Sequence, residues 1–248
     1  MKIKTVRTEK ITVNKYSVFE LLDKYVPSLK EKSIVAVSSL VVSLCEGNVF
    51  PIGTVNLEKL IKKEADLYFK LNHSMGRFGL TIKNGVFVAN SGIDESNSNG
   101  YYVLWPKNPQ LTANRIRRYL SLRFKLKSVG VLITDSRSIP LRWGTLGVGI
   151  AHSGFKALNS YVAKPDIFGR KFVATRLSIV DGLAAAAGIV MGEGAEQTPI
   201  IIIENAPFVK FQPRNPTSKE INALKIDLED DLFSPLLKAV TWKKGKVV

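Results

Sequence analysis

Residues 80–97 read LTIKNGVFVANSGIDESN, a pattern typical of a hairpin followed by a polar loop. Two short apolar runs, 80–83 and 86–88, flank Asn84-Gly85, the pair that best suits a type I′ hairpin because both positions tolerate a positive φ. The second strand leads directly into a glycine-broken polar loop, 90–97, that carries Asp94. An acidic loop of this kind is a hard-cation site in outline, because such cations prefer oxygen ligands.

Two further acids recur in similar settings. Asp135 follows the apolar run 129–134, and Glu193 lies inside Met191-Gly192-Glu193-Gly194. Asp135 is expected at a strand end, where open α/β sheets expose ligand-binding residues, and Ser136 adds a hydroxyl beside it. Taken alone, each acid is more often a turn residue or a helix cap. Their joint setting favours a magnesium or manganese site at which nucleotide phosphates and water complete the ligands.

The remaining sequence alternates helical and extended patterns around this hairpin. Hydrophobic spacing and caps predict helices over 17–26, 56–69, 109–126, 177–191 and 228–240, the last interrupted near Pro235. Apolar runs predict strands over 2–6, 34–37, 129–134, 171–175 and 199–203, and a glycine-punctuated interior segment over 145–150. The fold class is therefore α+β, with mixed sheets and flanking helices. We expect residues 1–248 to form a single unit, with two interwoven subdomains as the alternative, and 207–218 to link it to a C-terminal helical segment.

The net charge of +15, from 36 basic and 21 acidic residues, predicts a positive surface that attracts polyanions. Nucleic acid, nucleotide triphosphates and multiply carboxylated small molecules are all candidates, beside a solvated basic surface with no ligand. The strongly basic helix 109–126 likewise has two interpretations, a solvated face or a face that attracts anions. Its arginines are not interleaved with aromatic residues as a base-stacking platform requires, so a nucleic-acid-binding protein remains only the alternative interpretation.

Several classes of site and location are excluded by composition. Cys45 is the only cysteine and is expected to pack in the core, so an internal disulfide and multi-cysteine metal sites are ruled out. His73 and His152 are too few for a three-histidine centre and are expected to be structural. No apolar stretch approaches the roughly 20 residues that cross a bilayer, and residues 1–10 do not resemble a signal or transit peptide. We expect a cytoplasmic protein without a membrane partner.

Nucleotide-binding signatures of the common kinds are missing. The sequence has no Walker A segment, no dinucleotide fingerprint after a strand and no kinase signature, and residues 191–194 alone are a weak phosphate-loop signal. The residue patterns by themselves therefore lead no further than a basic mixed α/β protein with magnesium–nucleotide chemistry.

Four segments together resemble one family, the coenzyme F-420 γ-glutamyl ligases and the related folate γ-glutamate ligases. The segments are 90–97 (NSGIDESN), 130–136 (GVLITDS), 166–170 (DIFGR) and 184–194 (AAAAGIVMGEG). Their order and spacing carry the resemblance, which extends from about Ser17 to Ile203.

The resemblance implies the family's α+β fold, a homodimer and nucleotide-dependent amide formation with GTP or ATP. In this reaction an acceptor carboxylate becomes an acyl phosphate, and the amino group of L-glutamate displaces phosphate. The family pattern places metal-binding roles on Asp94, Asp135, Ser136 and Glu193. It places nucleotide contacts on Ser39, Asn97, Gly192, Gly194, Glu196 and Gln197. Phosphoryl transfer also needs fixed cations, and Arg142 and Arg170 are the expected catalytic pair.

Two departures from the family pattern bear on the substrates. The pattern tends to show Ser-Lys shortly before Glu-Gly, whereas Leu44 stands at the lysine position in Ser43-Leu44-Cys45-Glu46-Gly47. Ser138-Ile139 replaces a glycine-arginine pair that often follows the second aspartate. These departures favour a folate-type acceptor over an F-420-type one, and leave a catalytically inactive paralogue as a further alternative.

Overall fold

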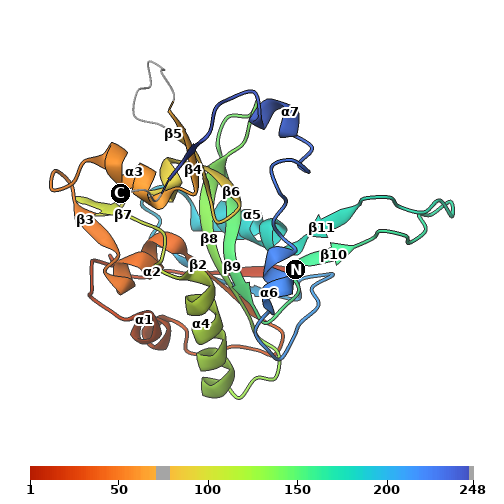
Figure 1. Cartoon of the computed structure of the whole chain (residues 1–248). Coiled ribbons are helices and arrows are strands. Elements are labelled where there is room, and N and C mark those ends of the chain that lie inside the picture. The colour runs from red at the N-terminus through yellow and green to blue at the C-terminus, as the bar shows by residue number, and fades with distance from the viewer. Residues whose placement is uncertain (71–78, 246–248) are drawn as a thin grey trace.

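A five-stranded mixed sheet forms the centre of the protein (Figure 1). The computed structural model describes residues 1–70 and 79–245. The strand order is β1 (Lys2–Val6), β12 (Ile200–Glu204), β2 (Ile34–Ser38), β8 (Gly130–Ser138) and β9 (Thr145–Ser153). Only β2 and β8 pair in parallel, and the other neighbours are antiparallel. The predicted α+β class with mixed sheets is therefore confirmed.

Helices cover both faces of this sheet because its strands direct apolar side chains to both faces. Helix α5 (Ile179–Met191) packs on the face that carries Ile34, Ala36 and Leu132. Helices α1 (Val18–Tyr25), α2 (Ser39–Glu46) and α4 (Pro109–Arg123) pack on the opposite face. A capping box between Ser17 and Glu20 starts α1 as predicted. Cys45 contacts this second core, in agreement with its predicted role.

A four-stranded antiparallel sheet holds the predicted hairpin. Its order is β13 (Lys243–Lys244), β4 (Leu67–Lys70), β5 (Gly79–Lys83) and β6 (Val86–Ala89). Asn84 and Gly85 both have positive φ, 53° and 77°, so the hairpin prediction is confirmed. A 3₁₀ turn, η1 (Asn90–Gly92), follows β6, and β3 (Val49–Pro51) pairs with β7 (Tyr101–Val103) nearby.

The predicted helix over 56–69 is wrong in its second half. Asn56 caps α3 (Leu57–Glu64) as expected, but Ala65 ends the helix in an extended conformation and the next residues form β4. The apolar and aromatic side chains of 67–69 fit strand pairing with β5 as well as they fit a helical repeat, and the available sheet edge decides between them. The basic helix was also predicted three residues too long, since α4 ends at Arg123.

A long hairpin arm projects from the body between β10 (Leu158–Ser160) and β11 (Arg176–Ser178) (Figure 1). The predicted strand over 171–175 is wrong, because only Lys171 makes an isolated bridge, to Pro165, and the strand forms afterwards. Three apolar side chains of the arm, Ile167, Phe168 and Val173, are 91%, 89% and 84% exposed. None of the three packs into the two hydrophobic cores of the described residues.

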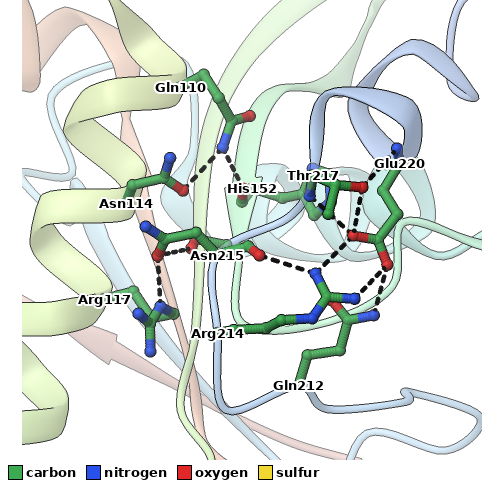
Figure 2. Close-up of polar contacts among 10 residues, drawn as sticks. Gln110, Asn114, Arg117, His152, Gln212, Arg214, Asn215, Thr217 and Glu220 are labelled. Atoms are coloured by element: carbon green, nitrogen blue, oxygen red, sulfur yellow. Dashed lines mark hydrogen bonds and ion pairs between the residues drawn. The ribbon is translucent and has the colours of Figure 1, made fainter.

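The segment 207–218 contains no helix or named strand before Ser218, where α6 begins, but hydrogen bonds join it to the body. Figure 2 shows Asn215 between Arg117 of α4 and Arg214, and Glu220 receiving hydrogen bonds from Arg214, Gln212 and Thr217. Gln110 of α4 joins the same region by donating to the carbonyl of His152. The segment predicted as a linker is therefore hydrogen-bonded to α4 and to the end of β9.

The C-terminal helical segment is shorter than predicted. Helix α6 (Ser218–Asn222) precedes the range expected to be helical, 228–240, and within that range the only helix is the short α7 (Ser234–Leu237). Pro235 lies in the first turn of α7, where a proline starts a helix more readily than it continues one. Across the described residues, no helix is long and apolar enough to cross a membrane.

Candidate active site

One cavity of about 460 Å³ gathers most of the residues singled out from the sequence. It opens where the loop after η1, the start of α2, the middle of β8 and the loop after α5 meet an N-terminal segment, 8–12. The predicted site residues in its lining are Asp94, Asn97, Asp135, Ser136, Gly192, Glu193, Gly194, Glu196 and Gln197.

Asp135 reaches the cavity because its neighbouring strand stops. The prediction that Asp135 ends a strand is wrong, since β8 continues to Ser138. Strand β2, however, pairs with β8 only as far as Ser38 opposite Thr134, and the chain then turns into α2. Asp135 is the first residue of β8 beyond that parallel pair, so its side chain meets the beginning of α2 rather than another strand.

The Asp135 carboxyl is held by neighbours yet is costly to ionise. Burial raises its pKa to about 6, and the nearby Asp94 carboxylate adds to this, while hydrogen bonds from Trp105, the Ser136 backbone and the Ser39 side chain act in the opposite direction. Ser39 thus contacts the site through Asp135. A buried carboxyl beside a second carboxylate is an arrangement that a bound cation would stabilise.

Asp94 is fixed in its loop by backbone and side-chain bonds. Its N–H donates to the carbonyl of Val103 at 3.0 Å, and its own carbonyl accepts from Val103 at 2.8 Å. The carboxylate accepts from the Ser96 N–H at 2.7 Å and from its hydroxyl at 2.9 Å. Asp94 is therefore a turn residue, and the same turn presents its exposed carboxylate to the cavity.

The loop after α5 forms the opposite wall. Gly192 ends the helix with a φ of 72°, and Glu196 folds back so that its carboxylate accepts from the Gly194 N–H at 2.8 Å. Asn97 donates from its side chain to the Gly194 carbonyl at 3.1 Å, which ties the two predicted loops together. The Gln197 carbonyl accepts from the Thr8 N–H at 2.8 Å.

Some predicted site residues are not brought together. Across residues 1–70 and 79–245, no three His, Cys, Asp or Glu side chains lie close enough to hold one metal ion, so Glu193 shares the cavity with Asp94 and Asp135 but does not complete a three-acid site with them. Arg142, on the β8–β9 loop, and Arg170, on the arm, are exposed and lie outside the cavity lining of this chain. Their catalytic role stays a prediction.

His152 does not line the cavity. His73 lies outside the described residues. His152 is 1% exposed on β9, its ring is 5.4 Å from the ring of Phe155, and burial lowers its pKa to about 4. These contacts agree with a structural role for His152.

The cavity is acidic although the whole chain is basic. Its charged lining consists of Glu9, Asp94, Asp135, Glu193 and Glu196 against Lys10. Glu9 is already neutralised by Lys15 and Lys24, and its pKa is held well below its usual range, mainly by Lys24. The uncompensated carboxylates are oxygen donors that fit a hard cation such as Mg²⁺ or Mn²⁺. Helix α2, whose first turn lines this cavity, begins with no side-chain cap, and this leaves backbone N–H groups suited to an anion.

Trp105 is a site residue that sequence reasoning missed. It is 2% exposed, and its Nε1–H donates to the Asp135 carboxylate in a short hydrogen bond. Trp105 follows β7 in an apolar run with no helical or strand periodicity, so only the folded arrangement reveals the contact.

A region of 200 residues is shared with a known protein family. A family model described as "F420-0:Gamma-glutamyl ligase" matches residues 6–205. The chain therefore belongs to this family and is an amide-forming ligase.

Individual relatives agree with this assignment. The chain is 37% identical over 233 residues to the "Coenzyme F420:L-glutamate ligase" of Methanococcus maripaludis strain C7, which covers 88% of this chain and 90% of that protein. Proteins with the same name from Methanocaldococcus jannaschii and Methanopyrus kandleri are 42% identical over 128 residues and 32% identical over 190 residues. The first of these matches covers 51% of each chain, and the second covers 70% of this chain and 75% of its relative.

Proposed function

We propose that this protein is a nucleotide-dependent γ-glutamyl ligase that adds L-glutamate to a carboxylate of a coenzyme F-420-type acceptor. The observation that carries the proposal is the meeting of Asp94 and Asp135, from segments 41 residues apart in the chain, at one acidic cavity beside the start of α2. The names of the relatives support the amino acid and the acceptor.

The proposed reaction has two steps. An acceptor carboxylate oxygen attacks the terminal phosphorus of GTP or ATP, the bond to the nucleoside diphosphate breaks, and an acyl phosphate forms. The amino nitrogen of L-glutamate then attacks the acyl carbon, phosphate leaves, and the nitrogen loses a proton to give the amide. Both steps develop charge on phosphate oxygens, so positioning and electrostatic stabilisation supply most of the catalysis.

Asp94 and Asp135 would hold Mg²⁺ or Mn²⁺, with Ser136 and Glu193 close by in the same cavity. Such an ion supplies charge neutralisation for the nucleotide phosphates. The chain itself fixes the two carboxylates by the Asp94 turn and by the hydrogen bonds to Asp135. The loop contact between Asn97 and Gly194 closes one side of the cavity, and we place the nucleotide against this loop and the start of α2.

A folate-type acceptor is the second candidate, favoured by Leu44 and Ser138-Ile139 at positions where the family pattern differs. Leu44 lines the cavity and is 2% exposed, so its identity bears directly on the ligand. Both acceptors are anionic and end in a carboxylate. The basic surface of the chain suits either one.

The deciding experiment is mass spectrometry of the products formed from L-glutamate, Mg²⁺ or Mn²⁺, GTP or ATP, and each acceptor in turn. We expect a glutamyl adduct on the F-420-type acceptor, with release of nucleoside diphosphate and phosphate. Asp94→Asn and Asp135→Asn should each remove turnover while leaving the circular dichroism spectrum unchanged. Asp230→Asn, at an exposed aspartate of the C-terminal segment, is the matched control and should retain full turnover. Wild-type turnover in either site variant would refute the metal assignment.

A further inference from the structure

Lys83, the last residue of β5, carries a charge that is almost completely buried. Its side chain is 8% exposed, and its Nζ lies 2.8 Å from the Glu64 carboxylate at the end of α3. Removing an ammonium group from water is costly, and the Glu64 carboxylate, whose side chain is itself 26% exposed, offsets only part of that cost. A purely structural role would be filled equally well by an apolar side chain of similar length.

The same ammonium group lies against Trp105. The Lys83 Nζ is 5.4 Å from the centroid of the Trp105 ring, a cation–π contact shielded from water. The other edge of the indole faces Asp135, to which Nε1–H donates. A cation over the ring withdraws electron density and strengthens the N–H as a donor, because neighbouring polar contacts polarise one another where water is excluded.

The indole has little freedom to move away from this position. Gly92 lies against its N–H edge, and a Cβ at that position would come within 2.1 Å of Nε1. The Asn48 side chain donates to the Trp105 carbonyl at 2.7 Å and holds the backbone. The ring therefore has a fixed place between Lys83 and Asp135.

We propose that Glu64, Lys83 and Trp105 form a chain of positioning residues that fixes the Asp135 carboxylate for cation binding. The inference rests on the proposed function, in which Asp135 is a metal ligand. Trp105 engages the Oδ2 oxygen of the carboxylate, and Asp135 lines the cavity that it shares with Asp94. Residues that orient a metal ligand typically change metal affinity 10- to 100-fold when they are replaced.

The test is Mn²⁺ binding to the nucleotide-free protein, followed by the electron paramagnetic resonance signal of free Mn²⁺. We expect Lys83→Met and Trp105→Phe to raise the Mn²⁺ dissociation constant about tenfold or more. Lys62→Met is the matched control. Lys62 also pairs with a glutamate at 2.8 Å and lies 5.6 Å from an aromatic centroid, that of Tyr68, but its side chain is 39% exposed. This control should bind Mn²⁺ as the wild type does.

A second measurement does not depend on metal. The indole N–H resonance of Trp105, assigned by its loss in Trp105→Phe, should shift in both Lys83→Met and Asp135→Asn and stay unchanged in Lys62→Met. Lys83→Arg, which retains a cation over the ring, should restore most of the Mn²⁺ affinity and of the resonance position.

The outcomes separate this inference from the proposed function. If the wild type binds Mn²⁺ and Asp135→Asn does not, but folded Lys83→Met binds normally with an unshifted indole resonance, the positioning role is refuted and Lys83 is structural. If the wild type binds no Mn²⁺, the metal assignment is wrong, and the positioning role, which depends on it, is refuted as well. A resonance that still shifts in Lys83→Met would then show only that the contact exists.

Discussion

Asp135 gives the protein a residue whose ionisation opposes folding. Its folded-state pKa, about 6, lies above the ordinary value of 3.8, so the folded state favours the protonated acid. Well below pH 3.8 the group is protonated in both states. As the pH rises from about 4 to about 6, the unfolded state releases this proton while the folded state retains it, so wild-type stability falls over this window and levels off above it.

We therefore expect Asp135→Asn to be more stable than the wild type at pH 7.5, by about 3 kcal/mol in the free energy of unfolding, since a pKa raised from 3.8 to about 6 corresponds to roughly 1.4 kcal/mol per unit. The difference should close below pH 4. Urea unfolding at several pH values measures it, and Asp230→Asn, at an exposed position, should show no such trend. Equal stability of Asp135→Asn and wild type at pH 7.5 would mean that the carboxylate is fully hydrated.

Leu44 offers a second test at the residue scale. It lines the cavity where the family pattern expects a lysine. Leu44→Lys should strengthen nucleotide binding, measured by calorimetry, because it adds a cation to an acidic cavity that must accept phosphates. The thermal midpoint without nucleotide should fall, since the position is 2% exposed. Leu44→Met, which keeps the side chain apolar, is the control. Unchanged nucleotide affinity in Leu44→Lys would place the phosphates away from residue 44.

The sequence could predict the acidic loops but not how they meet. Asp94 was identifiable because a type I′ hairpin delivers its loop, a local property of Asn84-Gly85. The contact of Asp135 with Trp105 joins residues 30 positions apart and depends on where β2 ends, which no local pattern encodes. For the same reason Arg142 and Arg170 were plausible by residue type, and the fold places them outside the cavity.

At the scale of elements, the packing of α5 on β9 depends on Gly147. A Cβ at Gly147 would lie 2.2 Å from the backbone oxygen of Ala184, so the helix rests directly on the strand. This confirms the close backbone approach expected over 145–150.

We expect Gly147→Ala to lower the free energy of unfolding by about 2–3 kcal/mol, because helix and strand must separate. The control is Gly182→Ala in the same helix. Gly182 has no atom within 4 Å of its Cβ position and is exposed, so alanine there should stabilise the protein by about 0.5–1 kcal/mol. Urea unfolding of both variants measures the pair. A neutral Gly147→Ala would mean that α5 shifts without cost.

Elements with clear caps or buried runs were predictable, and those fixed by long-range pairing were not. Ser17, Asn56 and Gly192 marked helix ends through local hydrogen bonds or a positive φ. The change from helix to strand after Glu64 depends on β5, which pairs with 67–70, and so could not be read from helical spacing. The residues of 228–240 were overpredicted because most of their apolar side chains remain at the surface.

At the scale of the whole molecule, the hairpin arm carries apolar side chains that remain exposed in a single chain. A two-stranded hairpin is marginally stable in water, and this one exposes Ile167, Phe168 and Val173. We therefore propose that a second copy of the chain covers the arm, in line with the homodimer expected from the family resemblance.

The combined variant Ile167→Ser and Phe168→Ser should change the mass measured by light scattering from dimer to monomer. Leu232→Ser, at a position 86% exposed outside the arm, is the control and should remain dimeric. A monomeric wild type, or a dimeric double variant, would contradict the proposal.

The arm also determines how the protein responds to proteases. Where no second copy covers the arm, Arg170 and Lys171 are exposed along it, so trypsin meets these peptide bonds before those of the sheet. A cut there would leave β9 in one fragment and β12 in the other, although both belong to the same five-stranded sheet. The two fragments would therefore migrate together under native conditions and separate only when the protein is denatured.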